Sequence, residues 1–393
     1  MKDRVSYESQ VLYVGPTQTG TFGSQVLTGI TPTQLHHVNR LESTLDTSTE
    51  VVYQYGSLDH VGTVQGGIME STLEFEYHLA DAQNEKWLGF DISSLEVPAI
   101  SGMLQGINDE QNFYILTTER GDAVTTASTQ EFLEQEGMSV SAFGNAVIEN
   151  YYIRASLETI PSAVVSVNAS NFSYASGASG ILSPAITGSG CKSQETIIVP
   201  PPRATQLEVD ALRPAYINMY FSSGNLPYGG VALPTGASRT DGISPCSLSD
   251  FTLNLQLPRR INQRLGSHYP ISKPIKYPAQ VLFSCSAKTK DIVSGNLMDL
   301  ICSSGQDITI EMDNPYTENS NIALKIKNAY LDSNISQHDL LANEFINLNF
   351  VSPLGSASGD SRGLFLSGVA AEPQETTYGI SSSQLLSDTL ATR

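Results

Sequence analysis

The stretch from Gly66 to Ala80 alternates regularly between two kinds of side chain. One parity is largely apolar, and the other holds the polar and acidic residues Glu70, Thr72, Glu74, Glu76 and His78. A period of two predicts a β-strand with one face on a core and the other in water. Three glutamates on one strand face repel one another, so this face needs open water or a partner.

Similar short apolar runs continue along the chain, separated by turn residues. The 393 residues include 31 glycines and 19 prolines, and long amphipathic helical patterns are scarce. This pattern predicts a mainly β protein. The length allows two or three domains with cores of their own.

Two parts of the chain resemble each other in the order of their segments. Tyr151 to Ser176 matches Leu324 to Ser352, because each holds an alternating strand, a short loop and a second strand with Asn-Phe. Upstream, Tyr55 to Phe90 matches Leu265 to Ile301, from a Gly-Ser pair through a strand to a helix candidate. The two helix candidates are Ala82 to Phe90 and Val293 to Cys302. The ordered likeness predicts an internal duplication.

The duplication predicts two tandem domains. The first spans 1–180, with an insertion around 96–136, and the second spans 215–354. Residues 181–214 are rich in Gly, Ser and Pro, which predicts a linker. Residues 355–393 have the composition of a C-terminal arm or flexible tail.

The net charge is −19 and is unevenly distributed. Residues 1–190 hold 6 Lys and Arg against 22 Asp and Glu, whereas residues 191–393 hold 15 against 18. A chain this acidic is not expected to bind nucleic acid through counterion release.

Sequence motifs with chemical meaning are missing or stand in the wrong context. No P-loop occurs, and "GDSRG" around Ser361 lacks the strand and helix that a nucleophile elbow needs. His36 and His37, as neighbours on a strand, would point apart, and the four cysteines show no zinc spacing. No apolar run has the length of a membrane helix, and the first residues lack the apolar region of a secretion signal. We therefore expect no enzyme activity, no cofactor and no metal.

Two stretches leave an alternative open. Glu74 and Glu76 lie close enough on one strand face to be the acid and base of a glycosidase, although a third acid, Glu70, extends the row and favours a solvated acidic strand face. Leu255 to Pro278 is basic and interleaved with tyrosines, which suits nucleic acid. The acidity of the whole chain favours instead a positive loop that docks on acid elsewhere.

Both repeats run strand, long loop, strand, helix, strand pair, and this order is clearest from Asp250 to Ile292. The order resembles that of the tail tube (major tail) proteins of long-tailed bacteriophages, in the form with two tube domains per chain. The resemblance implies two β-sandwich or half-barrel domains, each with a short flanking helix. It implies a virion protein, assembled in the host cytoplasm, whose homotrimers form pseudo-hexameric rings that stack into a tail tube.

The resemblance also implies partners and residue roles. The partners would be further copies of this chain and the tape measure, initiator and terminator proteins of the tail, with no membrane. DNA would pass through the lumen during ejection without specific binding, since a negative wall repels phosphate. The lumen-facing residues would be Glu70, Thr72, Glu74, Glu76, Gln280, Ser284, Ser286 and Lys288.

Two long loops, Gln34 to Gly67 and Arg259 to Tyr277, would reach the neighbouring ring. The inter-ring residues would be Arg259, Arg260, Arg264, His268, Tyr269, Lys273 and Lys276. Two other function classes remain open. A two-domain binding or decoration module on a virion or cell surface would display aromatic loops on a monomer or simple trimer. A β-scaffold glycosidase would need a cleft with a desolvated acid.

Overall fold

The computed structural model describes residues 10–17, 21–22, 25–26, 32–46, 49–56, 59–65, 70–104, 109–118, 138–177, 179–186, 191–200, 202, 212–221, 248–288, 305–313, 320–332, 345–355 and 362–368. Strands account for 65% and helices for 6% of these residues, so the predicted mainly β class is confirmed.

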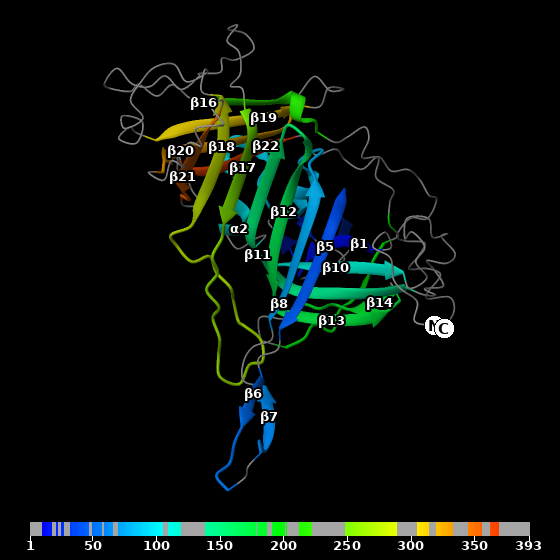
Figure 1. Ribbon diagram of the computed structural model, residues 1–393. Helices are drawn as coiled ribbons and strands as arrows, with labels where there is room; N and C mark the ends of the chain where they lie inside the picture. The colour runs from blue at the N-terminus through cyan, green and yellow to red at the C-terminus, as the bar shows by residue number, and fades with distance from the viewer. Residues whose placement is uncertain are drawn as a thin grey trace, which may run out of the picture.

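Eight antiparallel strands run side by side and form what we call the central sheet (Figure 1). In order across the sheet they are β5 (Val38–Asp46), β8 (Glu70–His78), β12 (Thr159–Ala169), β11 (Met138–Ser156), β17 (Leu248–Gln256), β18 (Gln280–Lys288), β21 (Phe345–Pro353) and β20 (Ser320–Leu331). The alternation in β8 is as predicted, since Leu73, Phe75 and Tyr77 are fully buried.

A further sheet flanks the central sheet at each end. The first flanking sheet consists of β4 (Thr33–Gln34), β1 (Gln10–Pro16), β10 (Gln111–Thr118), the start of β11 and β13 (Asn171–Ser176). The second consists of β16 (Ile217–Phe221), β19 (Gln306–Asp313), the start of β20, β22 (Gly363–Gly368) and β9 (Ser93–Pro98). Small pairs are β2 (Thr21–Phe22) with β3 (Gln25–Val26), β6 (Thr49–Val52) with β7 (Gly62–Gln65), and β14 (Ser179–Leu182) with β15 (Thr196–Ile198).

β11 and β20 belong to two sheets each because both strands bend. The bends fall at Asn145 (φ 47°) and Asn328 (φ 58°), in the left-handed region that asparagine tolerates better than most residues. A neighbouring strand holds each bend. The N–H of Asn145 donates to Asn112 Oδ1, and the N–H of Asn328 donates to Asp307 Oδ1, both at 3.0 Å. The bends therefore fold each flanking sheet back over the central sheet.

The two halves of the chain repeat one strand order. We call β1, β5, β8 and β10–β13 the first copy, and β16–β22 the second copy. The flanking orders β1-β10-β11-β13 and β16-β19-β20-β22 correspond, as do the central orders β5-β8-β12-β11 and β17-β18-β21-β20. The register repeats as well. Arg40 pairs with Glu76 just after a bulge, and Asp250 pairs with Ser286 just after a bulge at the corresponding place.

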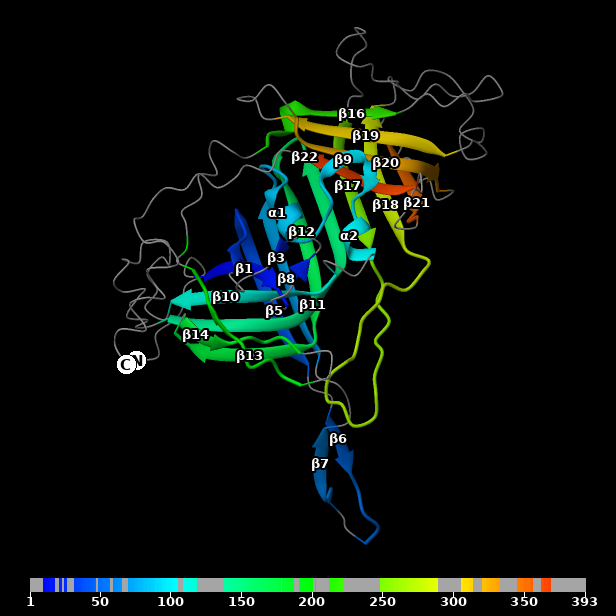
Figure 2. The ribbon, with the colours of Figure 1, turned by 180° about the vertical axis from the view of Figure 1, so that it is seen from behind.

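The main core lies between the central sheet and the two flanking sheets. Figure 2 shows α1 (Gln83–Trp87), β9 and α2 (Ser101–Leu104) on this side of the central sheet. The largest central-sheet contributors are Leu73, Phe75, Tyr77, Tyr151, Leu253, Phe283 and Phe350. Each such side chain favours folding by about 1.5–3 kcal/mol. Because this core is shared, it holds the two copies together.

Two segments differ from the sequence prediction. Residues 96–136 are not simply an insertion, because β10 takes the place in the first flanking sheet that β19 takes in the second. Residues 355–393 are not simply a tail, because β22 pairs with both β20 and β9 and is buried at Leu364, Phe365 and Leu366. Residues 105–108, 119–136, 356–361 and 369–393 lie outside the described residues.

Within the predicted linker, 181–214, the described residues 181–186 and 191–200 pack closely on the first flanking sheet. Ile181, Ile197 and Val199 are buried in a second apolar cluster with Tyr13 and Tyr114. The Tyr13 hydroxyl donates to the carbonyl of Pro200 at 2.9 Å. A short 3-10 turn, Pro214–Tyr216, leads into the second copy. Isolated apolar residues in a Gly/Ser-rich stretch carry no clear period, which is why the sequence did not predict this packing.

The register of the repeat is partly as predicted. Gly56 and Gly266 correspond, but Phe350 in β21 takes the place of Val167 in β12, so Asn349-Phe350 does not match Asn171-Phe172. α1 is shorter than the predicted Ala82 to Phe90. The second helix candidate, Val293 to Cys302, lies outside the described residues.

Candidate functional site

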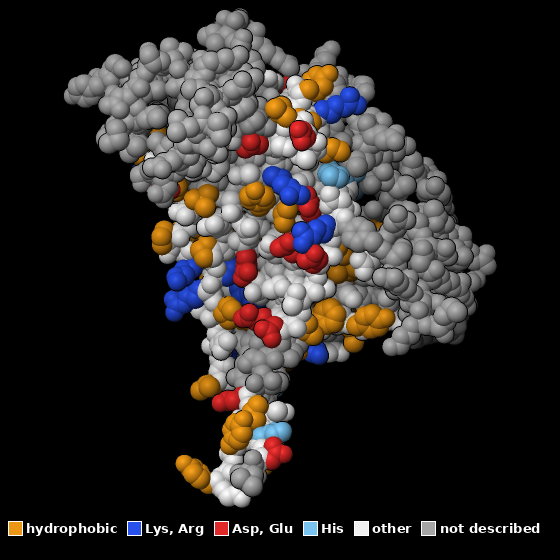
Figure 3. All heavy atoms as spheres, viewed as in Figure 1, with side chains coloured by type: hydrophobic (Ala, Val, Ile, Leu, Met, Phe, Trp, Pro, Cys, Tyr) orange, Lys and Arg blue, Asp and Glu red, His pale blue; other side chains and the backbone are white. Residues whose placement is uncertain are grey.

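The face of the central sheet that points away from the core is polar, and we call it the polar face. Figure 3 views this face and shows charged side chains gathered over β8, β12 and β11. The predicted lumen residues of β8 and β18 lie on it, and they correspond pairwise. Glu70 takes the place of Gln280, Glu74 that of Ser284, and Glu76 that of Ser286. The side chain of Lys288 lies outside the described part.

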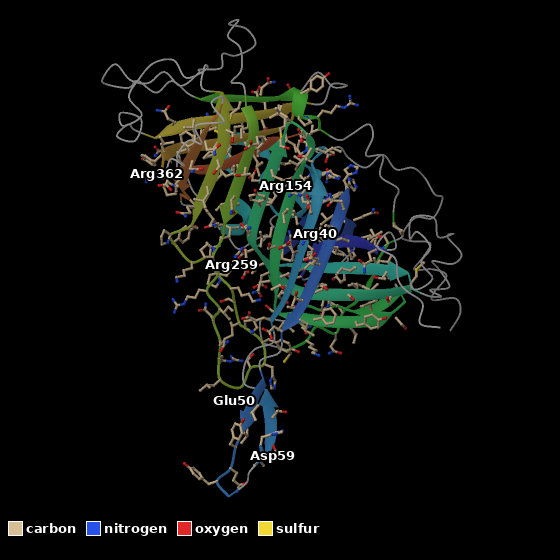
Figure 4. The ribbon with its side chains drawn as sticks, in the orientation of Figure 1. Arg40, Glu50, Asp59, Arg154, Arg259 and Arg362 are labelled. Carbon is tan, nitrogen blue, oxygen red and sulfur yellow. The ribbon has the colours of Figure 1, made fainter. Side chains whose placement is uncertain are left out.

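The glutamates of the first copy are not a bare acidic row, because arginines stand among them (Figure 4). Arg154 in β11 forms an ion pair with Glu76, whose side chain is nearly buried. Burial alone would raise the pKa of Glu76, but hydrogen bonds from Ser162 and Arg154 and the charge of Arg154 hold it below the ordinary value. Arg40 in β5 lies 2.7 Å from Glu42 and 3.9 Å from Glu74. The sequence pattern of β8 could not reveal either arginine as a neighbour.

The second copy presents hydroxyl and amide groups in the same positions. Ser284 Oγ donates to Asn349 Oδ1 at 2.7 Å, and Ser286 Oγ lies 2.7 Å from Asn347 Oδ1 and 3.0 Å from Asp250 Oδ1. The polar face therefore has an acidic half with two arginines and a nearly neutral half.

Two ribbons protrude from the same end of the central sheet (Figure 1). The first ribbon, residues 47–69, joins β5 to β8 and contains β6 and β7. The second ribbon, residues 257–279, joins β17 to β18. The two have equal length and register, since Val52 pairs with Gly62 as Asn262 pairs with Ser272. The range Gln34 to Gly67 predicted as a loop is thus partly strand, because β5 occupies Val38–Asp46.

The tips of the ribbons expose apolar side chains. Tyr55 and Leu265, which correspond, are fully exposed, and Val61 and Ile271, which also correspond, are more than half exposed. Of the predicted inter-ring residues, Arg260, Arg264, His268 and Lys276 are exposed and Tyr269 is half-buried. An exposed apolar surface on a protruding arm indicates a partner surface.

Arg259 and Lys273 differ from their prediction, because they are buried at the base of the second ribbon. The side chain of Arg259 is 1% exposed and donates to Asp109 Oδ1 at 2.6 Å and to the carbonyl of Ile148 at 2.8 and 3.0 Å. The Lys273 ammonium donates to Asn168 Oδ1 at 2.6 Å. Both residues therefore anchor the ribbon to the first copy of the same chain.

Burial shapes the pKa values at this base. It lowers the pKa of Lys273 to about 8, although Glu149, Glu70 and Glu110 act in the opposite direction. Burial raises the pKa of Asp109 and Glu110, while Arg259 opposes both shifts. The acids and the two cations thus depend on one another for charge balance.

One buried acid was not found from the sequence. Glu85 in α1 is fully buried, and its Oε1 accepts hydrogen bonds from Tyr77 at 2.7 Å and Tyr151 at 2.9 Å. Burial raises its pKa to about 7. This desolvated acid sits in the core, whereas Glu76 has a lowered pKa. A glycosidase needs an acid that is desolvated and also lines a cleft open to substrate, and neither Glu85 nor Glu76 meets both conditions.

The pair His36-His37 does not lie on a regular strand. His37 has a φ of 57°, so the argument that the two rings must point apart does not apply. The rings are 6.0 Å apart, and His36 contacts Trp87 edge-on. Burial lowers the pKa of His37 to about 4. Within the described ranges, no three His, Cys, Asp or Glu side chains are grouped so as to hold a metal ion.

Comparison with known proteins gives no relative. No protein-family model and no curated protein matches the chain. Among the described residues, no helix is both long and apolar enough to cross a membrane.

Proposed function

We propose that this chain is a structural virion protein whose trimers form pseudo-hexameric rings that stack into a phage tail tube. The observation that carries the proposal lies at the two ends of the central sheet. There, apolar side chains are exposed at positions that are buried where the two copies meet inside the chain.

The internal junction is the pairing of β11 with β17, from Asn150 opposite Gln256 to Ser156 opposite Asp250. At one free end, β5 corresponds to β17. Leu45 in β5 is 48% exposed, whereas Leu255 at the same place in β17 is fully buried. An edge strand with an apolar face is a template for pairing with another chain.

The other free end shows the same contrast. β20 corresponds to β11, and Tyr330 is 41% exposed where Val147 is 1% exposed. On the first flanking sheet, Tyr174 is 60% exposed where Leu366 is 1% exposed. The counterparts of Asn150–Ser156 in the internal junction are residues 333–339, which follow β20 and lie outside the described residues. Joining the sheet end at β20 of one chain to β5 of the next would follow the pattern of the internal junction and would cover the exposed apolar positions of β5 and β20.

The register of the central sheet suits a closed barrel. Tracing the paired residues across β8, β12, β11, β17 and β18 places Gln280 level with Glu74. In the repeat, however, Gln280 corresponds to Glu70. The second copy is therefore shifted along the strands by four residues relative to the first, over a distance of four strands. Strand rise and spacing convert this into a tilt of about 35°, in the range of closed barrels. Three chains would give roughly 24 strands and a backbone diameter of about 45 Å, wide enough for a DNA duplex.

The polar face would line the bore, since the flanking sheets occupy the other side. Its acidic half would repel the phosphates of passing DNA, and its amide and hydroxyl half would offer few charges to bind them. The ribbons, which leave the barrel at one end, would contact the next ring through their exposed tips.

A second candidate is a binding or decoration module. Tyr53 and Tyr55 on the first ribbon are largely exposed, as expected of a module that recognises its partner through aromatic loops. This candidate requires no closed ring.

Native mass spectrometry of the purified chain tests the proposal. We expect wild-type trimers and their multiples, monomers for Leu45→Glu, and trimers for the control Leu157→Glu, which changes an exposed leucine on the turn between β11 and β12. A wild-type monomer at high concentration, or trimers that tolerate Leu45→Glu, would contradict the ring and direct attention to the binding module.

A further inference from the structure

The two ribbons share their register but differ at the two positions that anchor the second one. The bridge Arg259–Ile275 corresponds to the pair Thr49–Gln65. By the same register, Thr63 takes the place of Lys273. The first ribbon therefore carries threonines where the second carries its buried cations. Thr63 is exposed, whereas Lys273 is buried.

The surfaces that would receive the two ribbons also differ in charge. The second ribbon rests on a charged seat in the first copy, which we define as Asp109, Glu110, Ile148 and Asn168. Arg259 and Lys273 make four kinds of contact there, to the Asp109 carboxylate, the Ile148 carbonyl and the Asn168 carbonyl and amide oxygens. Glu110 accepts a hydrogen bond from Asn145 at 2.7 Å and lies near both cations.

The second copy has a neutral seat at the corresponding place. Val351, opposite Tyr330, replaces Asn168, and Leu331 replaces Ile148. Gly305 replaces Glu110, and no side chain fits there, because an added Cβ would collide with Asn328. Tyr330, Leu331, Val351 and Gly305 form this neutral seat, and Tyr330 is 41% exposed. Asp332 stands beside it at the place of Glu149, and Ser304, the counterpart of Asp109, lies outside the described residues.

We propose that the neutral seat receives the base of the first ribbon of a second copy of this chain, with Thr63 against Val351. The charged seat is filled within each chain by its own second ribbon, so the neutral seat is the one left for a second copy, and pairing it with a first ribbon makes first and second copies alternate around a ring. This inference rests on the proposed ring and adds the rule for its order.

The alternation follows from the cost of a mismatch. A first ribbon on the charged seat would leave Asp109 and Glu110 buried without Arg259. A second ribbon on the neutral seat would bury Lys273 against Val351, which offers no hydrogen-bond acceptor in its side chain. An unpaired buried charge is strongly unfavourable, so each ribbon rejects the wrong seat.

A charge exchange on the full chain tests the junction. Thr63→Lys should weaken trimer formation at least tenfold, and adding Val351→Asn, which recreates the pair found between Lys273 and Asn168, should restore most of it. Gln54→Lys adds the same charge to the same ribbon away from the seat, and it should leave the trimer unchanged. Trimer dissociation is measured by sedimentation equilibrium, and thermal melting of each variant reports folding.

The outcomes separate the two proposals. Rings that form normally with Thr63→Lys, or that are not restored by Val351→Asn, overturn the junction and leave the ring intact. A wild-type chain that forms no trimer overturns both. Restoration by Val351→Asn supports the junction even if Thr63→Lys lowers stability, because a local folding defect in the first ribbon would not be repaired in β21.

Discussion

The first and second copies have the same strand order, the same bends and corresponding bulges in β5 and β17, yet they carry different charges. Glu70, Glu74 and Glu76 of the first copy stand where the second has Gln280, Ser284 and Ser286. The ribbons show the reverse, since the second ribbon holds five cations and the first holds two acids. Buried apolar positions and the two bends are shared and specify the fold, whereas charge diverges both at exposed positions and at the buried base of the second ribbon.

The largest effect is expected at the anchor that only the second ribbon has. Arg259→Ala leaves Asp109 and the Ile148 carbonyl without their buried partner, so it should lower the free energy of unfolding by about 3–5 kcal/mol. The matched change Arg260→Ala removes an exposed arginine next to it and should cost less than about 0.5 kcal/mol. Urea unfolding of both variants measures the contrast, and equal losses would refute the anchor.

Leu255 at the internal junction and Leu45 at the free edge occupy corresponding places, so substituting each one compares the two environments. Leu255→Ala creates a cavity in the shared core and should cost about 3 kcal/mol in the isolated chain. Leu45→Ala should cost less than about 1 kcal/mol there, because its side chain is half exposed. Urea unfolding below the concentration of assembly is the measurement. A large loss for Leu45→Ala would mean that β5 is already covered.

The first copy also contains a titrating core acid, Glu85, and Ala287 stands in the second copy where Tyr77, which donates a hydrogen bond to Glu85, stands in the first. Burial raises the pKa of Glu85 from 4.5 to about 7, so folding favours the protonated form. Its contribution is complete below pH 4.5 and is lost as the pH rises through 7, by about 3 kcal/mol.

Glu85→Gln keeps a hydrogen-bonding side chain without the titration. We expect the difference in unfolding free energy between wild type and Glu85→Gln to change by about this amount between pH 4.5 and 8. If the unfolding free energies of wild type and Glu85→Gln changed in parallel with pH, Glu85 would not titrate in the core. Glu76 acts in the opposite sense, because its lowered pKa gives stability that is lost as the pH falls.

The smallest effect on stability is expected on the polar face. Glu74→Lys should change the unfolding free energy by less than about 1 kcal/mol and leave rings able to form, but it should impair DNA ejection. The corresponding change Ser284→Lys tests the neutral half. Glu70 is left unchanged because its charge favours the buried Lys273 ammonium, and Glu76 because it is paired with Arg154. Normal ejection rates in phage carrying the acidic-half variant would overturn the lumen assignment.

Much of the fold follows from local patterns. The period of two in β8 and β18, and the Gly-Ser pair at each ribbon tip, are visible in the sequence because they depend only on neighbouring residues. Gly56 and Gly266 both adopt positive φ, which explains why glycine stands at both tips.

Other features depend on residues far apart in the chain. The bends at Asn145 and Asn328 carry no distinctive motif, so the sequence did not show that one strand serves two sheets. The burial of Arg259 depends on Asp109, which lies 150 residues away. The charge balance predicted that this positive loop docks on acid elsewhere, but it could not identify Asp109 as the partner of Arg259, nor Arg154 as the partner of Glu76.

The proposed ring requires first and second copies to alternate around a closed barrel. Cryo-electron microscopy of the assembled protein is the decisive measurement. We expect threefold rings of six similar copies, with the sheet end at β20 of one chain joined to β5 of the next and the polar face lining the bore. A compact monomer, or an assembly in which the edge of β5 stays exposed, would contradict the proposed ring.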